Sequence, residues 1–411
     1  MGKIFCGIDW SERHHDVALV DQDGQLLAKR RIEETNAGWA ELLTMFADAG
    51  DSSHEPIPVA IETPRGLLVA MLRATGRPVY SINPMAVARY RERHTVSRRK
   101  SDHADAMVLA NILRTDAHMH RPLPHDTELA RSIAVLARAH QDATWRRTKA
   151  SNELRSALRE FYPSFLNAFA NKPDFLISAD ARAVLAIAPT PAAAAKLTKT
   201  RIATALRKAG RRRGIDALAA ELHQALHHPQ LRQPTLIEQA MGIQALTLLS
   251  TLDTECRNVD QLGQACATAF AQHPDYAIIT SFPGLGDTAG ARVLAELGDD
   301  RHRFADARAV KAYAGSAPVT RASGRSISIT HRRIKNDRLA AAGWIWAFAA
   351  NVHSPAAKQH YRRRRDLHGD RHAAALRHLF NRLLGCLHHC LQNRQTYDES
   401  KAFATLQPTA S

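Results

Sequence analysis

Two short stretches decide the fold: residues 4–9 read IFCGID, and residues 57–62 read IPVAIE. Both are apolar runs of strand length, and each ends in an acid, Asp9 or Glu62. Around them the sequence predicts a meander of three strands, followed by helices that alternate with strands. This pattern indicates an α/β domain, in which helices cover a mixed sheet. The strands are expected at 4–9, 15–20, 26–32, 57–62 and 78–82, and the helices at 36–47, 66–75, 85–94 and 102–114.

A third stretch, residues 100–106, reads KSDHADA and begins the last of these helices. Asp102 and Asp105 are three residues apart, so their carboxylates share one helical face. Together with Asp9 and Glu62 they make four acids that would repel one another if they met without a cation. Mg²⁺ prefers carboxylate oxygens and substrate phosphates, and phosphoryl transfer uses pairs of such ions. The four acids therefore predict a site for two Mg²⁺ ions, although each acid alone is explained as well by a helix cap or a strand end.

The charge of the chain points to a polyanionic partner. Among 411 residues, Lys and Arg total 56 and Asp and Glu total 40, a formal net charge of +16. Such an excess favours nucleic acid, because neutralising phosphates releases condensed counterions. No apolar run approaches the roughly 20 residues that span a bilayer, and the first residues lack the apolar core of a signal peptide. We therefore expect a cytoplasmic protein without a membrane partner, which associates with the nucleoid when it binds DNA.

The character of the sequence changes twice, which predicts three domains. Residues 1–125 form the α/β domain with the acids, and residues 126–272 form a helical region rich in Ala, Leu, Arg and Gln. Its last helix, at 236–270, is either an antiparallel coiled-coil arm, a dimerisation element or an ordinary bundle helix. Residues 273–411 form a mostly helical third domain. The long helix has a loose apolar stripe made of Ile243, Leu246, Ser250, Val259 and Leu262.

The motifs around the acids have a recognisable order. They are Gly7-Ile8-Asp9, Ile61-Glu62, Ile82-Asn83-Pro84 and the stretch 100–106. In this order they resemble the RNase H-like, RuvC-like fold of Holliday-junction resolvases. More closely, the whole chain resembles the DEDD transposases of bacterial insertion sequences, which are bridge-RNA-guided recombinases. The resemblance implies that the four metal-binding acids of that family are Asp9, Glu62, Asp102 and Asp105.

A second set of motifs lies between residues 279 and 330. It comprises Phe282 to Gly286, Ala295 to Asp299, Arg303-Phe304, Ala312 to Pro318 and Ala322-Ser323-Gly324. These motifs resemble the carboxy-terminal part of the same family, in which the serine of the Ser-Gly pair is the proposed nucleophile. The resemblance gives that role to Ser323. From the residues alone, Ser323 lies in a loop-like stretch, 320–328, and is not preferred over Ser316, Ser326 or Ser328.

The resemblance also implies a function. It implies a transposase or recombinase that cuts and rejoins donor and target DNA, with Mg²⁺ at the acids and a phosphoserine link that conserves the bond energy. It implies guidance by a structured noncoding RNA, and a homo-oligomer, either a dimer or a dimer of dimers. Two alternatives stay open: a Mg²⁺-dependent junction nuclease that uses water as nucleophile, and a non-catalytic nucleic-acid-binding protein.

Nucleic-acid contacts are expected before the acidic helix, around the serine and at one turn. The basic residues expected before the acidic helix are Arg98, Arg99 and Lys100. Those expected around the serine are Arg321, Arg325, Arg332 and Arg333. Arginines beside the serine would hold a phosphodiester and stabilise its transition-state charge. The turn with Gly284 and Gly286 resembles a helix-hairpin-helix element, in which backbone N–H groups approach a phosphate. A plain helix-joining turn explains the tetrapeptide at residues 283–286, Pro-Gly-Leu-Gly, equally well.

Overall fold

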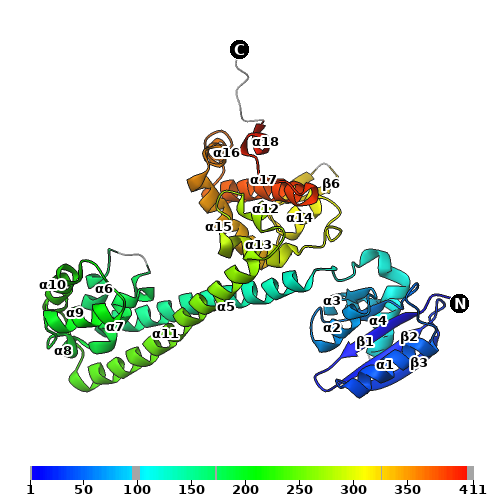
Figure 1. Ribbon diagram of the computed structural model, residues 1–411, viewed down its shortest axis with the longest axis horizontal. Helices are drawn as coiled ribbons and strands as arrows, with labels where there is room; N and C mark the ends of the chain where they lie inside the picture. The colour runs from blue at the N-terminus through cyan, green and yellow to red at the C-terminus, as the bar shows by residue number, and fades with distance from the viewer. Residues whose placement is uncertain (1, 95–101, 172–173, 325, 405–411) are drawn as a thin grey trace, which may run out of the picture. The chain divides into compact units, whose positions relative to one another are not determined.

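The structure is a computed structural model, and it describes all residues except 1, 95–101, 172–173, 325 and 405–411 (Figure 1). The chain gathers into two compact units, residues 1–125 and residues 126–411, and each is described by itself. In the described parts of the chain, no helix combines the length and the apolar character that crossing a bilayer requires.

The first unit is built on a five-stranded sheet with the order β3-β2-β1-β4-β5; Figure 1 labels β1, β2 and β3 of this sheet. β2 pairs antiparallel with both β1 and β3, whereas β4 runs parallel to both β1 and β5. The predicted meander and the mixed sheet are therefore confirmed. The strands are β1 (Phe5–Trp10), β2 (His14–Val20), β3 (Leu26–Glu33), β4 (Val59–Ile61) and β5 (Val79–Ser81).

Helices cover both faces of this sheet, because its central strands bury side chains on both sides. α1 (Asn36–Asp48) and α2 (Leu67–Ala74) pack on one face, where their apolar side chains join Ile8 and Ile61 in one core. α3 (Pro84–His94) and α4 (Asp102–Asp116) cover the other face and form a second core with Ala60. A short 3-10 turn, η1 (Ala117–Met119), ends this set of helices.

Two long helices, α5 (Glu128–Phe161) and α11 (Thr235–Ala271), lie side by side in the second unit (Figure 1). They are antiparallel, because Ile133 near the start of α5 clusters with Phe270 near the end of α11, while Leu158 clusters with Leu249. The buried residues of α11 recur at intervals of three and four, as in a coiled coil. They include Gly242, Ala245, Leu249, Leu252, Cys256, Val259, Cys266 and Phe270.

The α11 seam includes Val259 of the predicted stripe but differs from that stripe towards the start of the helix. Ile243 is 69% exposed and Leu246 is 39% exposed, whereas Gly242 and Ala245 are buried. Near the start of α11 the reason is close approach: a Cβ at Gly242 would overlap the side chain of Thr190, so that position needs glycine. A prediction that follows the large apolar side chains selects the neighbouring face.

A helical lobe packs at the far end of this helix pair, around Tyr162 and Phe165 (Figure 1). Side-chain caps begin several of its helices, for example Ser178 for α7 and Thr198 for α9. The lobe consists of α6 (Pro163–Ala168), η2 (Phe175–Ile177), α7 (Ala179–Ile187), α8 (Pro191–Ala194), α9 (Lys199–Lys208) and α10 (Ile215–Leu226).

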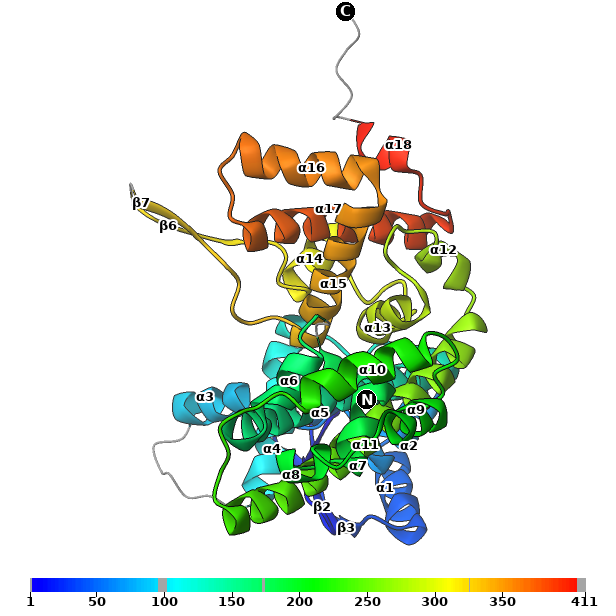
Figure 2. The same cartoon turned by 90° about the vertical axis from the view of Figure 1, so that its left-hand side faces the viewer.

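The remaining elements surround Trp346 and include one β-hairpin, which extends away from the helices (Figure 2). Their core also takes in Ile133 of α5 and Phe270 of α11. Because these long helices belong to it, the suggested boundary between residues 272 and 273 does not divide compact units. The elements are α12 (Tyr276–Thr280), α13 (Asp287–Leu297), α14 (Ala307–Tyr313), β6 (Val319–Ser323), β7 (Ser326–Thr330), α15 (Asp337–His353), α16 (Pro355–Asp366), α17 (His372–Asn393) and α18 (Glu399–Ala402).

Candidate active site: the acidic edge and the serine hairpin

Asp9 and Glu62 lie at the carboxyl ends of neighbouring parallel strands. Ile8 of β1 is paired in register with Ile61 of β4, and each acid is the next residue of its chain. Side chains of a strand alternate between the two faces of a sheet. Since Ile8 and Ile61 point into the core beneath α1 and α2, Asp9 and the residues in register with it belong to the opposite face, which α4 covers.

Asp105 lies on α4, which packs against β1 on this same face of the sheet. A Cβ added at Gly7 would overlap the carbonyl oxygen of Ala106 and the amide nitrogen of Ala110, so the helix backbone rests directly on this glycine. Asp105 precedes Ala106, and Gly7 lies two residues before Asp9 on the same face of the strand. The side chain of Asp105 is 11% exposed. We call Asp9, Glu62 and Asp105 the acidic edge.

A cation from the protein already contacts the acidic edge. Arg91 of α3 forms an ion pair with Asp105, with 2.6 Å between Nη2 and Oδ1. Among the described residues, no three His, Cys, Asp or Glu side chains gather closely enough to hold a metal ion. Asp102 is the first residue of α4, and the position of its side chain lies outside the described part. Carboxylate oxygens are the donors that Mg²⁺ requires, so the chemistry of the donor set fits a hard cation.

The sequence analysis missed one acid beside this edge. Asp16 of β2 is the cross-strand neighbour of Asp9, and it is 2% exposed. It accepts two hydrogen bonds from Arg31 of β3, from Nε at 3.1 Å and from Nη2 at 2.7 Å. The signal in the sequence was a charged residue in an otherwise apolar strand, HHDVALV. Arg31 therefore holds the Asp16 carboxylate in place beside Asp9 and offsets its charge.

Ser323 is the last residue of β6 and lies at the tip of a two-residue hairpin. It is paired in register with Ser326, and Gly324 in the turn has a φ of +56°, which suits glycine. The expected loop-like stretch is therefore wrong, because residues 319–323 and 326–330 pair along their whole length. We call residues 319–330 the serine hairpin; both of its strands are almost wholly exposed.

The structure separates the serines that the sequence left equal. Ser316 is 3% exposed, donates to the Lys311 carbonyl oxygen at 3.2 Å and accepts from Asn381 at 3.2 Å. Ser316 is therefore a buried structural residue. Ser323, Ser326 and Ser328 are all exposed on the hairpin, where a polymeric substrate has access to them.

Two family models match the chain over these two regions. A model for DEDD transposases of the IS110 type, described as a transposase, matches residues 6–163, and one described as the transposase IS116/IS110/IS902 family matches residues 276–362. A mini-circle protein of Streptomyces coelicolor, named as the candidate transposase of IS117, is 57% identical over 99% of this chain and 98% of its own length. The chain belongs to the IS110/IS116/IS902 family of transposases.

Other members are more distant. The 42 kDa protein of insertion element IS900 from Mycobacterium paratuberculosis is 29% identical over 96% of this chain and 97% of its own length. The 43.6 kDa protein of insertion element IS110 from Streptomyces coelicolor is 30% identical over 73% of this chain and 72% of its own length. Membership of this DEDD transposase family makes the chain a DNA-acting enzyme and implies that it depends on a divalent metal.

The glycine turn of this transposase is explained largely by packing. Gly284 has a φ of +83°, and a Cβ there would come within 2.8 Å of the Ala349 side chain on α15. Gly286 is exposed and precedes α13. The first turn of α13 carries Asp287, which accepts a hydrogen bond from the Tyr276 hydroxyl at 2.8 Å. A carboxylate at this position opposes binding of a phosphate to the helix start.

The predicted basic contacts are placed unevenly. Arg321 is exposed on β6, two residues from Ser323 and on the same face of the strand. Arg333 is exposed and Arg332 is half-buried in the segment after β7. The other predicted residues, Arg98, Arg99, Lys100 and Arg325, lie outside the described residues.

Proposed function

We propose that this transposase has an RNase H-like first unit, in which Asp9, Glu62, Asp102 and Asp105 hold two Mg²⁺ ions, and that Ser323 attacks the scissile phosphate of DNA. The observation that carries the proposal is the placement of Asp9 and Glu62 at adjacent strand ends, on the sheet face against which the helix of Asp105 packs. The bound cations would neutralise charge on the phosphate and on the attacking and leaving oxygens.

Ser323 and Arg321 carry out the rest of the proposed strand cleavage. Ser323 Oγ forms a bond to phosphorus, the bond from phosphorus to one deoxyribose oxygen breaks, and the serine proton passes to a base while the leaving oxygen gains a proton. Arg321, on the same strand face as Ser323, holds a non-bridging phosphate oxygen and offsets its growing charge. The phosphoserine ester keeps the energy of the broken bond for rejoining.

The proposal includes the partners. A structured noncoding RNA selects donor and target DNA, and the protein contacts mainly backbone phosphates, as its charge of +16 favours. The active form is a homo-oligomer, a dimer or a dimer of dimers, in which the acids of one subunit act with the serine of another.

The test is strand exchange by the purified protein with Mg²⁺, the RNA of its element, and donor and target DNA. Ser323→Ala is compared with Ser328→Ala, which removes another exposed serine of the same hairpin. Asp9→Asn is compared with Asp48→Asn, which removes an exposed acid at the end of α1. We expect Ser323→Ala and Asp9→Asn each to lower exchange by at least about 10³-fold, with DNA binding kept, and both controls to stay near wild type.

The outcomes separate the alternatives. Full exchange by Ser323→Ala, together with no covalent protein–DNA adduct in the wild type, would reject the serine and favour a nuclease that uses water. DNA binding by the wild type without any nicking would favour a non-catalytic protein. Full exchange by Asp9→Asn would reject the metal site.

A further inference from the structure

The chain leaves the helical body at the end of α14 and returns to it at the start of α15, and the serine hairpin lies between these points. We call these two points, at Tyr313 and Asn336, the roots of the hairpin. They are joined directly, because the backbone N–H of Asn336 donates to the Tyr313 carbonyl oxygen at 2.8 Å. Gly315 (φ +71°) packs against Lys335, and a Cβ there would lie 2.8 Å from the Lys335 Cβ. The exit and the return of the hairpin are thus fixed to each other.

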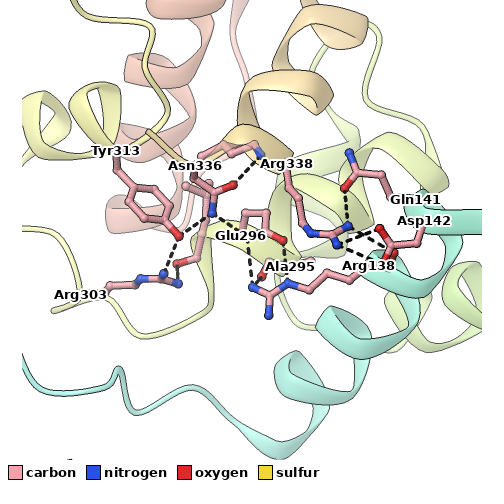
Figure 3. Close-up of polar contacts among 11 residues, drawn as sticks. Arg138, Gln141, Asp142, Ala295, Glu296, Arg303, Tyr313, Asn336 and Arg338 are labelled. Carbon is pink, nitrogen blue, oxygen red and sulfur yellow. Dashed lines mark hydrogen bonds and ion pairs between the residues drawn. The ribbon is translucent and has the colours of Figure 1, made fainter. Parts of the chain in front are cut away.

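Side chains tie the same two roots to the body (Figure 3). Glu296 of α13 is 3% exposed, and its Oε2 accepts from Asn336 Nδ2 at 2.7 Å. The same Nδ2 donates to the Tyr313 hydroxyl at 2.6 Å. The Tyr313 hydroxyl also accepts from Arg303 Nη2 at 3.1 Å. We call Glu296, Tyr313 and Asn336 the root clasp.

The root clasp reaches α5 through an ion pair. Arg138 donates to both carboxylate oxygens of Glu296, from Nε at 2.8 Å and from Nη2 at 3.1 Å (Figure 3). The hydrogen bond to this carboxylate raises the pKa of Arg138. Beside it, Arg338 of α15 contacts Asp142 of α5 at 2.8 Å. The base of the hairpin is therefore braced on two helices besides its own.

The hydrogen bonds of Asn336 to Glu296 and Tyr313 go beyond what the start of α15 needs. Asn336 already caps α15 by accepting from the Leu339 amide at 2.8 Å, a task that Asp or Ser performs equally well. A buried carboxylate with its partners is often no more stable than apolar residues of the same volume, but it fixes one geometry. The network fits the task of holding a direction better than the task of adding stability.

The hairpin needs such fixing, because it has no core of its own. From Val319 to Ser323 the strand extends about 13 Å at roughly 3.3 Å per residue. A tilt of about 10° at its base would move Ser323 by roughly 2 Å, while an error of about 1 Å at a reacting atom can cost 10²-fold in rate.

We propose that Glu296, Tyr313 and Asn336 are positioning residues, which set the direction of the serine hairpin and thereby the place of Ser323. This inference rests on the proposed role of Ser323. It assigns the three residues no contact with DNA and no part in proton transfer.

The decisive variant is Asn336→Asp. It keeps the cap of α15 but puts a second carboxylate against Glu296 in place of an amide donor. A matched control is Thr198→Ala, which removes the side-chain cap of α9 in the distant lobe and costs about 1 kcal/mol. Combining Asn336→Asp with Glu296→Gln exchanges donor and acceptor and restores one hydrogen bond between the two positions. Tyr313→Phe removes only the hydroxyl.

Three measurements are made on each full-length variant: the rate of covalent adduct formation at saturating DNA, the Kd for DNA, and hydrogen exchange in peptides covering residues 314–336. For Asn336→Asp we expect a 10- to 100-fold lower adduct rate, a Kd within twofold of wild type and faster exchange at both roots. The double variant should recover most of the rate, and Thr198→Ala should lower thermal stability without changing rate or exchange.

The measurements distinguish a wrong positioning role for the root clasp from a wrong nucleophile role for Ser323. If the wild type forms no adduct, the role of Ser323 is wrong, and hydrogen exchange alone decides whether the clasp fixes the hairpin. Unchanged exchange in Asn336→Asp overturns the inference. So does an adduct rate that follows thermal stability across all variants, Thr198→Ala included, or one that stays within twofold of wild type in Asn336→Asp.

Discussion

The acidic edge and the serine hairpin hold their functional groups in opposite ways. Asp9 follows three buried residues of β1, Glu62 follows the wholly buried β4, and α4 rests on β1 through Gly7 without space for a methyl group. Ser323 ends a largely exposed strand that pairs with β7, and its support comes from the roots of the hairpin. The first arrangement fixes atoms by close packing, and the second fixes a direction by hydrogen bonds. Substitutions in the packing that supports the acidic edge should therefore act mainly through stability, and substitutions at the roots of the hairpin mainly through rate.

The largest expected effect is that of Gly7→Ala. The added methyl overlaps backbone atoms of α4 at Ala106 and Ala110, which a rotamer change leaves in place. We expect a loss of about 3 kcal/mol or more in the stability of the first unit, because overpacking against a backbone forces a helix to shift. Urea unfolding followed by hydrogen exchange in residues 2–94 measures it.

The control for Gly7→Ala is Gly263→Ala in α11. Its added methyl would lie 3.4 Å from His140, an ordinary contact, and alanine favours a helix interior by about 1 kcal/mol over glycine. Gly263→Ala should be neutral or stabilising. Equal stability of wild type and Gly7→Ala would show that α4 has room to move away from β1, so close packing would not be what fixes the acidic edge.

The placement of Asp9 and Glu62 at neighbouring strand ends was predictable from the sequence, because burial leaves a pattern. Apolar runs that end in Asp9 and Glu62 predict strands that the sheet then places in register. The partners of these acids were not predictable, since the ion pair between Arg91 and Asp105 depends on how α3 packs beside α4. No periodicity of either helix contains that information.

The hairpin was missed for the opposite reason, because it buries almost nothing. In residues 319–330, Arg321 and Ser323 alternate with Thr320 and Ala322, so no hydrophobic face marks the first strand. Glu296 was visible only as part of a family motif, because a glutamate on a helix is normally solvated. Its burial follows from Arg138 and Asn336, which are far from it in the sequence.

Gly315→Ala should have an intermediate effect, and mainly on rate. Its φ of +71° is unfavourable for alanine, and its Cβ would meet Lys335 at the other root of the hairpin. We expect a loss of about 1–3 kcal/mol in stability, and a fall in adduct formation clearly greater than that of Thr198→Ala. A loss of stability with an unchanged adduct rate would mean that the roots do not direct the serine.

Acidic pH should lower the stability of the second unit more than that of the first unit. Burial, with Arg382 nearby, lowers the pKa of His360 to about 4, and burial also lowers the pKa of His140 and His378. An unfolded histidine takes up a proton near pH 6.5, while these stay neutral in the folded state. Stability is therefore full above pH 6.5 and falls towards pH 4, by about 1 kcal/mol for His360 after allowing for partial solvent screening.

Hydrogen exchange of the full chain at pH values between 6.5 and 4, corrected for intrinsic rates, compares the two units. Among the described side chains of the first unit, His15 is the histidine whose pKa burial lowers, so that unit should lose less stability. His360→Gln should flatten the slope for the second unit. Equal slopes for the two units, or an unchanged slope in His360→Gln, would contradict this prediction.

The smallest expected effect is that of Ile327→Thr on the serine hairpin. Ile327 is 69% exposed, and threonine keeps the β-branched shape, so unfolding should change by no more than about 0.5 kcal/mol. The matched substitution at the acidic edge, Ile61→Thr, puts a hydroxyl at a fully buried position of β4 and should cost about 2–3 kcal/mol. Urea midpoints of both variants measure the difference. A cost at Ile327 as large as that at Ile61 would mean that the hairpin packs against a surface in solution. The serine would then be held by packing, as the acids are, and the root clasp would not be needed to direct it.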